Sequence, residues 1–162
     1  MNNFFKKWLI GVGVVFLLSL IVIMITVTEA RQARFTVDVL EQYLEAYQLV
    51  EHRSIESLSQ LPDFDLVSPA ESLSLKSQDL KQGIHGGYIY DFQYLGNGKF
   101  VISASPVGLL PIWEFGITNS GNLRMNTRNV DAQADSYEEV EGWRLIPRKD
   151  KARSKDLPGY LQ

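Results

Sequence analysis

The chain has 162 residues, no cysteine and a formal net charge of −3. This length allows one small domain beyond a membrane segment, and the absence of cysteine excludes disulfides, a thiol nucleophile and thiolate metal sites. The slightly acidic balance gives no electrostatic reason to expect nucleic acid as a partner.

The first element is an uncharged run from Trp8 to Val27, which follows a short stub, residues 1–7. At about 1.5 Å per residue a helix over residues 8–27 crosses the roughly 30 Å hydrocarbon core of a bilayer. We therefore predict a single-pass transmembrane helix with the lipid bilayer as its partner. A cleaved signal peptide is the alternative, but its apolar core is usually about 7–15 residues long, so we expect an uncleaved anchor.

Positive charges beside the apolar run set its expected orientation. Lys6 and Lys7 directly precede the run, whereas Arg31 and Arg34 follow it, with Glu29 between them and the membrane. The lysine pair favours a cytoplasmic N-terminus. The C-terminal domain is then expected outside the cytoplasmic membrane.

Residues 28–53 are predicted to continue the same helix beyond the membrane, because no glycine or proline occurs between Glu29 and Val50. Apolar residues recur there at helical spacing, at Leu40, Tyr43, Leu44, Tyr47 and Val50. This stripe predicts a face that packs on the protein's own sheet, with a partner helix as the alternative occupant. A polar face is expected at Arg34, Asp38, Glu41, Glu45 and Gln48.

Residues 54–85 are interpreted as a connector, because they are rich in serine and are interrupted by Pro62 and Pro69. A short helical turn is expected around Ser54–Leu61, and another after Ser68.

From Gly86 onward the apolar period changes to two, which predicts a sheet domain over residues 86–146. The expected strands are 88–94, 100–105, 113–117 and 122–125, with tight turns at 96–98 and 119–121. Consecutive short strands form an antiparallel meander. The predicted fold class is α+β, a long N-terminal helix packed on a meander of about four strands.

The first of these strands carries a row of aromatic residues, Tyr88, Tyr90, Phe92 and Tyr94. We interpret the row as a core face covered by the helix. The alternative is a binding platform, which makes the protein a membrane-tethered sensor or ligand-binding module and requires Tyr90 or Tyr94 to be exposed.

An acidic stretch from Asp131 to Glu141 precedes the end of the sheet domain. Asp131 and Asp135 are a weak calcium candidate, since hard cations need several oxygen ligands from a looped chain. A solvated acidic loop is the preferred interpretation. Beyond it, Trp143, Leu145 and Ile146 are expected to dock on the domain, and the charged tail, residues 147–162, is expected to be disordered.

No pattern predicts catalysis. His52 is expected to be a solvated residue at the end of the helix, and His85 a turn residue before the first strand. The sequence has no paired histidine spacing for zinc, no nucleophile elbow and no phosphate-binding loop. We therefore predict a non-enzymatic protein with no catalytic residues and no cofactor.

The order of these elements resembles the superfamily of type IV pilins and type II secretion pseudopilins. Residues 86–108 and 113–124 are similar to the sheet of those proteins. A Gly-Tyr strand start, an Ala-x-Pro-like strand end and a Phe-containing strand before a glycine turn carry the similarity. They stand here as Gly87-Tyr88, Ala104-Ser105-Pro106 and Phe115 to Gly121.

The chain departs from that family at its N-terminus. Pilins carry a leader peptidase site, Gly followed by Phe, and a glutamate at the fifth mature position. Here Gly11 is followed by Val12, the fifth position is Phe16, and the apolar run contains no acid. The resemblance therefore implies an anchored, divergent relative with a structural or accessory role in an envelope assembly. No small residues spaced for helix association are evident, so no oligomeric state is inferred.

Overall fold

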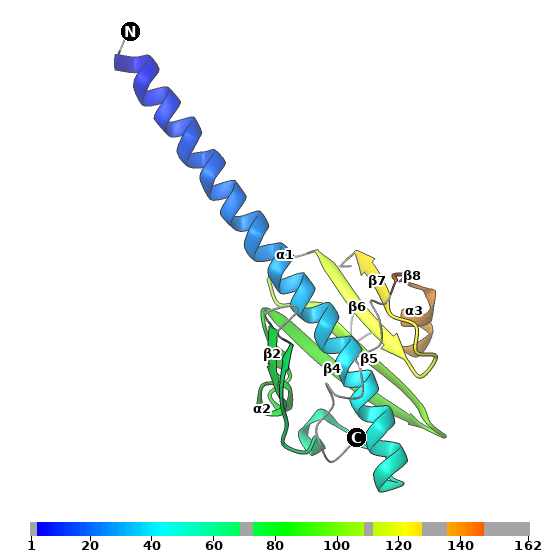
Figure 1. The fold of residues 1–162 in the computed structure, drawn as a ribbon. Helices are drawn as coiled ribbons and strands as arrows, with labels where there is room; N and C mark the ends of the chain where they lie inside the picture. The colour runs from blue at the N-terminus through cyan, green and yellow to red at the C-terminus, as the bar shows by residue number, and fades with distance from the viewer. Residues whose placement is uncertain (1–2, 69–72, 109–111, 128–135, 148–162) are drawn as a thin grey trace.

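One long helix lies across an antiparallel sheet (Figure 1). The computed structural model describes residues 3–68, 73–108, 112–127 and 136–147, with side chains from residue 10 onward. The fold is α+β, as predicted, and combines the long helix with a six-stranded and a two-stranded antiparallel sheet.

Helix α1 (Asn3–Glu51) is a single helix of 49 residues. Its first half projects away from the sheet, and its second half lies along it (Figure 1). Large apolar side chains are exposed all along the projecting half, from Ile10 to Val27. By length and composition this half qualifies as a membrane span, a property that membrane anchors and N-terminal signal sequences share.

The second half of α1 supplies the centre of the core. The side chains of Val37, Leu40 and Tyr43 are fully buried, and the rings of Tyr43 and Phe64 lie 4.8 Å apart. Two predictions for this half are wrong. Glu41 is buried rather than part of a solvated polar face, and Val50 is exposed rather than packed.

Both differences follow from how far along and around α1 other parts of the chain pack on it. The connector residues Leu58, Leu61 and Phe64 belong to the same core cluster as the second half of α1, so the helix packs on more than the sheet. The buried arc of the helix is wider than one apolar stripe and includes Glu41. The helix ends at Glu51, one residue beyond Val50, where the cover has ended.

The larger sheet is a meander in which every strand pairs with the next one in sequence, in the order β3-β4-β5-β6-β7-β8. The four predicted strands correspond to β4 (Tyr88–Gly96), β5 (Lys99–Pro106), β6 (Trp113–Thr118) and β7 (Arg124–Thr127). Two edge strands were not predicted, β3 (Ile84–His85) and β8 (Arg144–Leu145). Each has two residues, too few to show a period.

The connector contains the first expected turn and, beyond expectation, a β-hairpin and a further short helix. The 3-10 helix η1 (Leu58–Gln60) is the expected first turn. Strands β1 (Asp65–Ser68) and β2 (Leu73–Lys76) then form a hairpin in which buried Leu66 and Leu75 stand opposite one another, and helix α2 (Ser77–Lys81) follows. The turn expected after Ser68 falls on residues 69–72, outside the described residues.

The sheet is covered on both faces. Helix α1 covers one face, and helix α3 (Tyr137–Gly142) packs on the other. A Cβ atom at Gly116 would lie 2.8 Å from Val140 Cγ1 and 2.9 Å from the Trp143 ring, so the sheet and α3 are in direct contact there.

The acidic stretch from Asp131 to Glu141 was expected to be a solvated loop, but its last residues belong to helix α3. A capping box begins α3, in which the Ser136 hydroxyl accepts from the Glu139 backbone N–H and the Glu139 carboxylate accepts from the Ser136 N–H. Of the three side chains expected to dock, Trp143 and Ile146 are partly buried, but Leu145 is exposed. Residues 128–135, with Asp131 and Asp135, and residues 148–162 lie outside the described residues.

The tight turn between β3 and β4 fixes one end of the sheet on α1. Gly86 and Gly87 have φ values of +55° and +79°, a region that glycine enters without strain. A Cβ at Gly86 would lie 2.9 Å from Gln32 Oε1, and one at Gly87 would lie 3.1 Å from the Glu29 carboxyl carbon. This end of the sheet therefore sits at the level where the apolar half of α1 ends.

Candidate functional site

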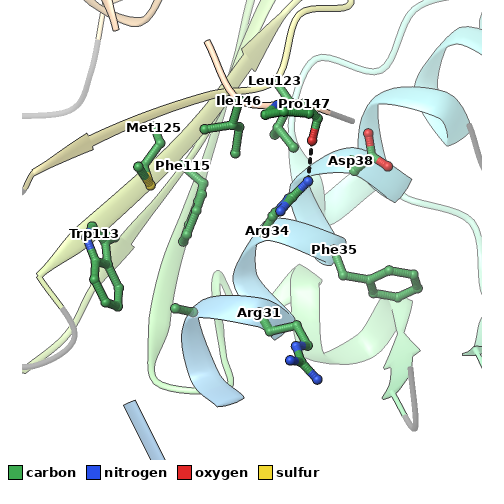
Figure 2. Close-up of a pocket in the computed structure, with 11 residues that line it drawn as sticks. Arg31, Arg34, Phe35, Asp38, Trp113, Phe115, Leu123, Met125, Ile146 and Pro147 are labelled. Atoms are coloured by element: carbon green, nitrogen blue, oxygen red, sulfur yellow. Dashed lines mark hydrogen bonds between the residues drawn. The ribbon is translucent and has the colours of Figure 1, made fainter. Parts of the chain in front are cut away.

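A groove of about 530 Å³ lies between α1 and the sheet, next to the point where α1 leaves its apolar half (Figure 2). Its walls come from α1, from β6 and β7, and from the chain segments beside β7 and β8. The lining residues are Ala30, Arg31, Arg34, Phe35, Asp38, Trp113, Phe115, Leu123, Met125, Ile146 and Pro147.

The two arginines of the groove differ in their surroundings. The Arg34 guanidinium donates a hydrogen bond to the Pro147 carbonyl oxygen, which closes one end of the groove (Figure 2). The Ile146 backbone N–H donates to the Leu123 carbonyl oxygen at 3.1 Å, so the same segment is tied to the sheet. The Arg31 side chain is exposed, and its guanidinium points away from Pro147 (Figure 2).

This combination of groups defines what the groove can accept. Apolar walls favour aliphatic or aromatic groups by removing their surface from water, and a guanidinium forms strong hydrogen bonds with phosphate or carboxylate. An amphipathic molecule with an anionic head fits both properties. No sequence pattern predicted this site, although Arg31, Arg34, Phe35 and Asp38 recur at helical spacing on one face of the helix.

A second polar cluster fixes α3 on the sheet. The Glu141 carboxylate accepts hydrogen bonds from the Thr118 hydroxyl, from the Ser120 hydroxyl at 2.9 Å and from Arg124 Nη2 at 2.7 Å. Hydrogen bonding from Thr118 lowers the pKa of Glu141, with further help from Ser120 and Arg124, although partial burial opposes the shift. The residue therefore acts as an ionised structural anchor for the helix.

The prediction for His52 is confirmed, whereas His85 belongs to strand β3 rather than to a turn. His52 is exposed and directly follows the end of α1. His85 ends β3 before the glycine turn, with its Nε2 atom 2.6 Å from the Gln32 amide nitrogen and its Nδ1 atom 3.6 Å from Asp79 Oδ2. These contacts join the β3–β4 turn to α1 and α2.

The aromatic row of β4 belongs to the core. Tyr88, Tyr90 and Phe92 are buried, and Tyr94 is partly buried against them. The Tyr88 hydroxyl donates to the Trp113 carbonyl oxygen at 3.1 Å, and burial raises the pKa of both Tyr88 and Tyr90, so both phenols stay neutral. The binding platform requires Tyr90 or Tyr94 to be exposed, but Tyr90 is buried and Tyr94 is partly buried.

The calcium candidates Asp131 and Asp135 lie outside the described residues. Among the residues that the structure describes, no three His, Cys, Asp or Glu side chains gather in a group able to hold a metal ion. The groove between α1 and the sheet is therefore the candidate site that the described residues offer.

Comparison with known proteins gives no relative: no protein-family model, no curated protein and no solved structure matches the chain. Function is therefore inferred from the structure itself, and chiefly from the division of α1 into an exposed apolar half and a half packed in the core.

Proposed function

We propose that this chain is a non-enzymatic, single-pass membrane protein of pilin-like architecture, with a structural or accessory role in an envelope assembly. The observation that carries the proposal is the division of α1 into an exposed apolar half and a half that forms the core of the domain. A membrane anchor and the central element of a folded domain are thus one continuous helix.

The surface of the projecting half favours lipid over water. The window of α1 that qualifies as a membrane span has none of its residues buried inside the molecule. A helix that is apolar on all sides is stable in a bilayer, or in contact with other apolar helices. Exposure of that surface to water would cost a large free energy. This cost supports membrane anchoring and lateral packing as the function of the projecting half.

The proposed topology places the N-terminus in the cytoplasm and the sheet domain outside the cytoplasmic membrane. Lys6 and Lys7 support this orientation through the positive-inside rule. The domain then presents its sheet edges and connector to the cell envelope, where an assembly partner would bind.

Topology is tested with single cysteines, since the chain has no native one. Gln48→Cys introduces a thiol at an exposed position near the end of α1, and Asn3→Cys is the matched control at its beginning. In intact cells an impermeant thiol reagent should label the first variant and not the second, and both should have the full-length mass. Labelling of Gln48→Cys only after lysis overturns the exported topology.

The mass of the protein tests whether the anchor is uncleaved, and its association with other proteins tests the assembly role. A product that lacks the first residues would show cleavage and contradict the uncleaved anchor. Chemical crosslinking in cells followed by purification in mild detergent should retain an envelope protein or a second copy of the chain. Recovery of the monomer alone would contradict the assembly role and leave the anchor in place.

A further inference from the structure

One chain connection at the membrane-facing end of the sheet differs in its chemistry from the two turns at the opposite end. The sequence from Val107 to Trp113, which joins β5 to β6, contains no charged residue. Val107 and Ile112 expose 52% and 43% of their surface. At the opposite end, the turns at residues 96–99 and 119–122 carry Gly, Asn, Ser and Lys, the residue types usual for turns in water.

Both ends of this apolar connection lie beside the residues that directly follow the apolar half of α1. The Val107 backbone N–H donates to the Gly87 carbonyl oxygen at 2.9 Å, and Gly87 lies against the Glu29 carboxylate. Trp113 shares the groove with Ala30 and Arg31. Val107 and Trp113 therefore both lie at the level of residues 29–31 of α1, directly after Thr28.

That level of α1 falls in the headgroup layer when the apolar half spans a bilayer. Residues 29–31 lie within about one helical turn, roughly 5 Å, of Thr28. The polar layer on each side of the hydrocarbon core is of similar depth, about 5–7 Å. Tryptophan is favoured at this depth, and an arginine there meets lipid phosphate. Aliphatic side chains at the same level can reach the hydrocarbon directly below it.

We propose that a surface formed by Val107, Ile112, Trp113 and Arg31, here called the rim, is a second membrane contact of this protein. The apolar rim residues enter the upper acyl and glycerol region, and the exposed Arg31 guanidinium binds lipid phosphate. The sheet domain is thereby held against the bilayer at two places, the apolar half of α1 and the rim. This inference rests on the proposed anchoring of α1.

The test compares three single-cysteine variants of the full chain in vesicles of phosphatidylcholine and phosphatidylglycerol. Ile112→Cys samples the rim, Leu95→Cys samples a similarly exposed apolar position beside the turn at the opposite end, and Leu18→Cys samples the apolar half of α1. Each thiol carries an environment-sensitive fluorophore. Quenching is measured with lipids that hold a nitroxide near the glycerol backbone or near the end of the acyl chain.

The expected result is strong quenching at Ile112→Cys by the shallow nitroxide, strong quenching at Leu18→Cys by the deep one, and none at Leu95→Cys. Adding Arg31→Gln to Ile112→Cys should reduce the shallow quenching. An unquenched label at Ile112→Cys with a quenched one at Leu18→Cys overturns the rim and leaves the anchor intact. Equal quenching at Ile112→Cys and Leu95→Cys also overturns it, because contact would not be specific to the rim.

An unquenched label at Leu18→Cys has a different meaning. It would show that α1 is not in lipid, which removes the proposed anchor and the rim together. The three positions therefore distinguish failure of this inference from failure of the proposed function.

Discussion

The two halves of α1 show that similar apolar residues on one helix can serve opposite purposes. Leu18 in the projecting half exposes 56% of its surface, whereas Leu40 in the second half exposes none. The projecting half is apolar on every side, and the second half is apolar on the arc that meets the sheet and the connector. The distribution of apolar residues around the helix, rather than their number, separates a membrane-type surface from a protein core.

Truncation of one leucine in each half gives the largest expected contrast. Leu40→Ala should lower the free energy of unfolding by about 2–5 kcal/mol, because it leaves a cavity in a closely packed core. Leu18→Ala should leave that free energy unchanged, because no part of the folded domain contacts its side chain. Urea unfolding of the full chain in detergent micelles, followed by tryptophan fluorescence, measures both. Equal losses would contradict the division of α1 into two halves.

The same comparison extends to the two faces of the sheet, one covered by the second half of α1 and the other by α3. Gly116→Ala places a methyl group against Val140 and Trp143 and should cost roughly 1–3 kcal/mol through overpacking. Gly142→Ala, at the end of α3, is the matched control, because its new methyl group meets nothing within 4 Å. Thermal unfolding of the two variants measures the difference. An unchanged midpoint for Gly116→Ala would show that α3 does not pack on the sheet.

The smallest expected effect concerns the carboxylate that fixes α3. Glu141→Gln should lower the free energy of unfolding by about 1–2 kcal/mol at neutral pH, because charge-assisted hydrogen bonds from Thr118 and Arg124 are weakened. The fold lowers the pKa of Glu141 below its ordinary value near 4.5. Its ionised form therefore stabilises the native state above that value, and the contribution disappears as the pH falls through the lowered pKa.

Urea unfolding of wild type and Glu141→Gln between pH 7 and pH 3 checks this sign. The difference between the two proteins should stay constant near neutral pH and shrink below about pH 4.5. A difference that grows on acidification would show that the native state favours the protonated carboxyl group. Ser120→Ala, which removes one neutral donor to the same carboxylate, should give a smaller difference with the same pH dependence.

The elements with a long, regular apolar period were predictable from the sequence. Residues close together in the sequence determine these elements. They are the part of α1 without glycine or proline, the alternating strand β4 and the turn at Asn97-Gly98. The burial of Tyr88, Tyr90 and Phe92 followed from the same alternation, since a sheet with one aromatic face needs an apolar cover.

The elements that depend on distant contacts were not predictable. The β1–β2 hairpin has four residues in each strand, and its pairing of Leu66 with Leu75 carries no local period. Burial of the Glu41 side chain is likewise not marked by any local apolar pattern. The groove brings residues of α1, the last of which is Asp38, together with residues of β6 and of the segment after β8, which lie 75 or more positions further along the sequence. No local pattern therefore places Arg34 beside Pro147.

The continuity of α1 has a mechanical consequence. Between Glu29 and Val50 the helix contains no glycine or proline, and its two glycines, Gly11 and Gly13, lie in the apolar half. A helix without such breakers has no hinge at the level where the apolar half ends and the domain begins. With α1 anchored in a bilayer as proposed, a change in bilayer thickness that tilts the helix is transmitted to the sheet as a rotation of the whole domain. The helix is then a stiff lever between the membrane and the sheet domain.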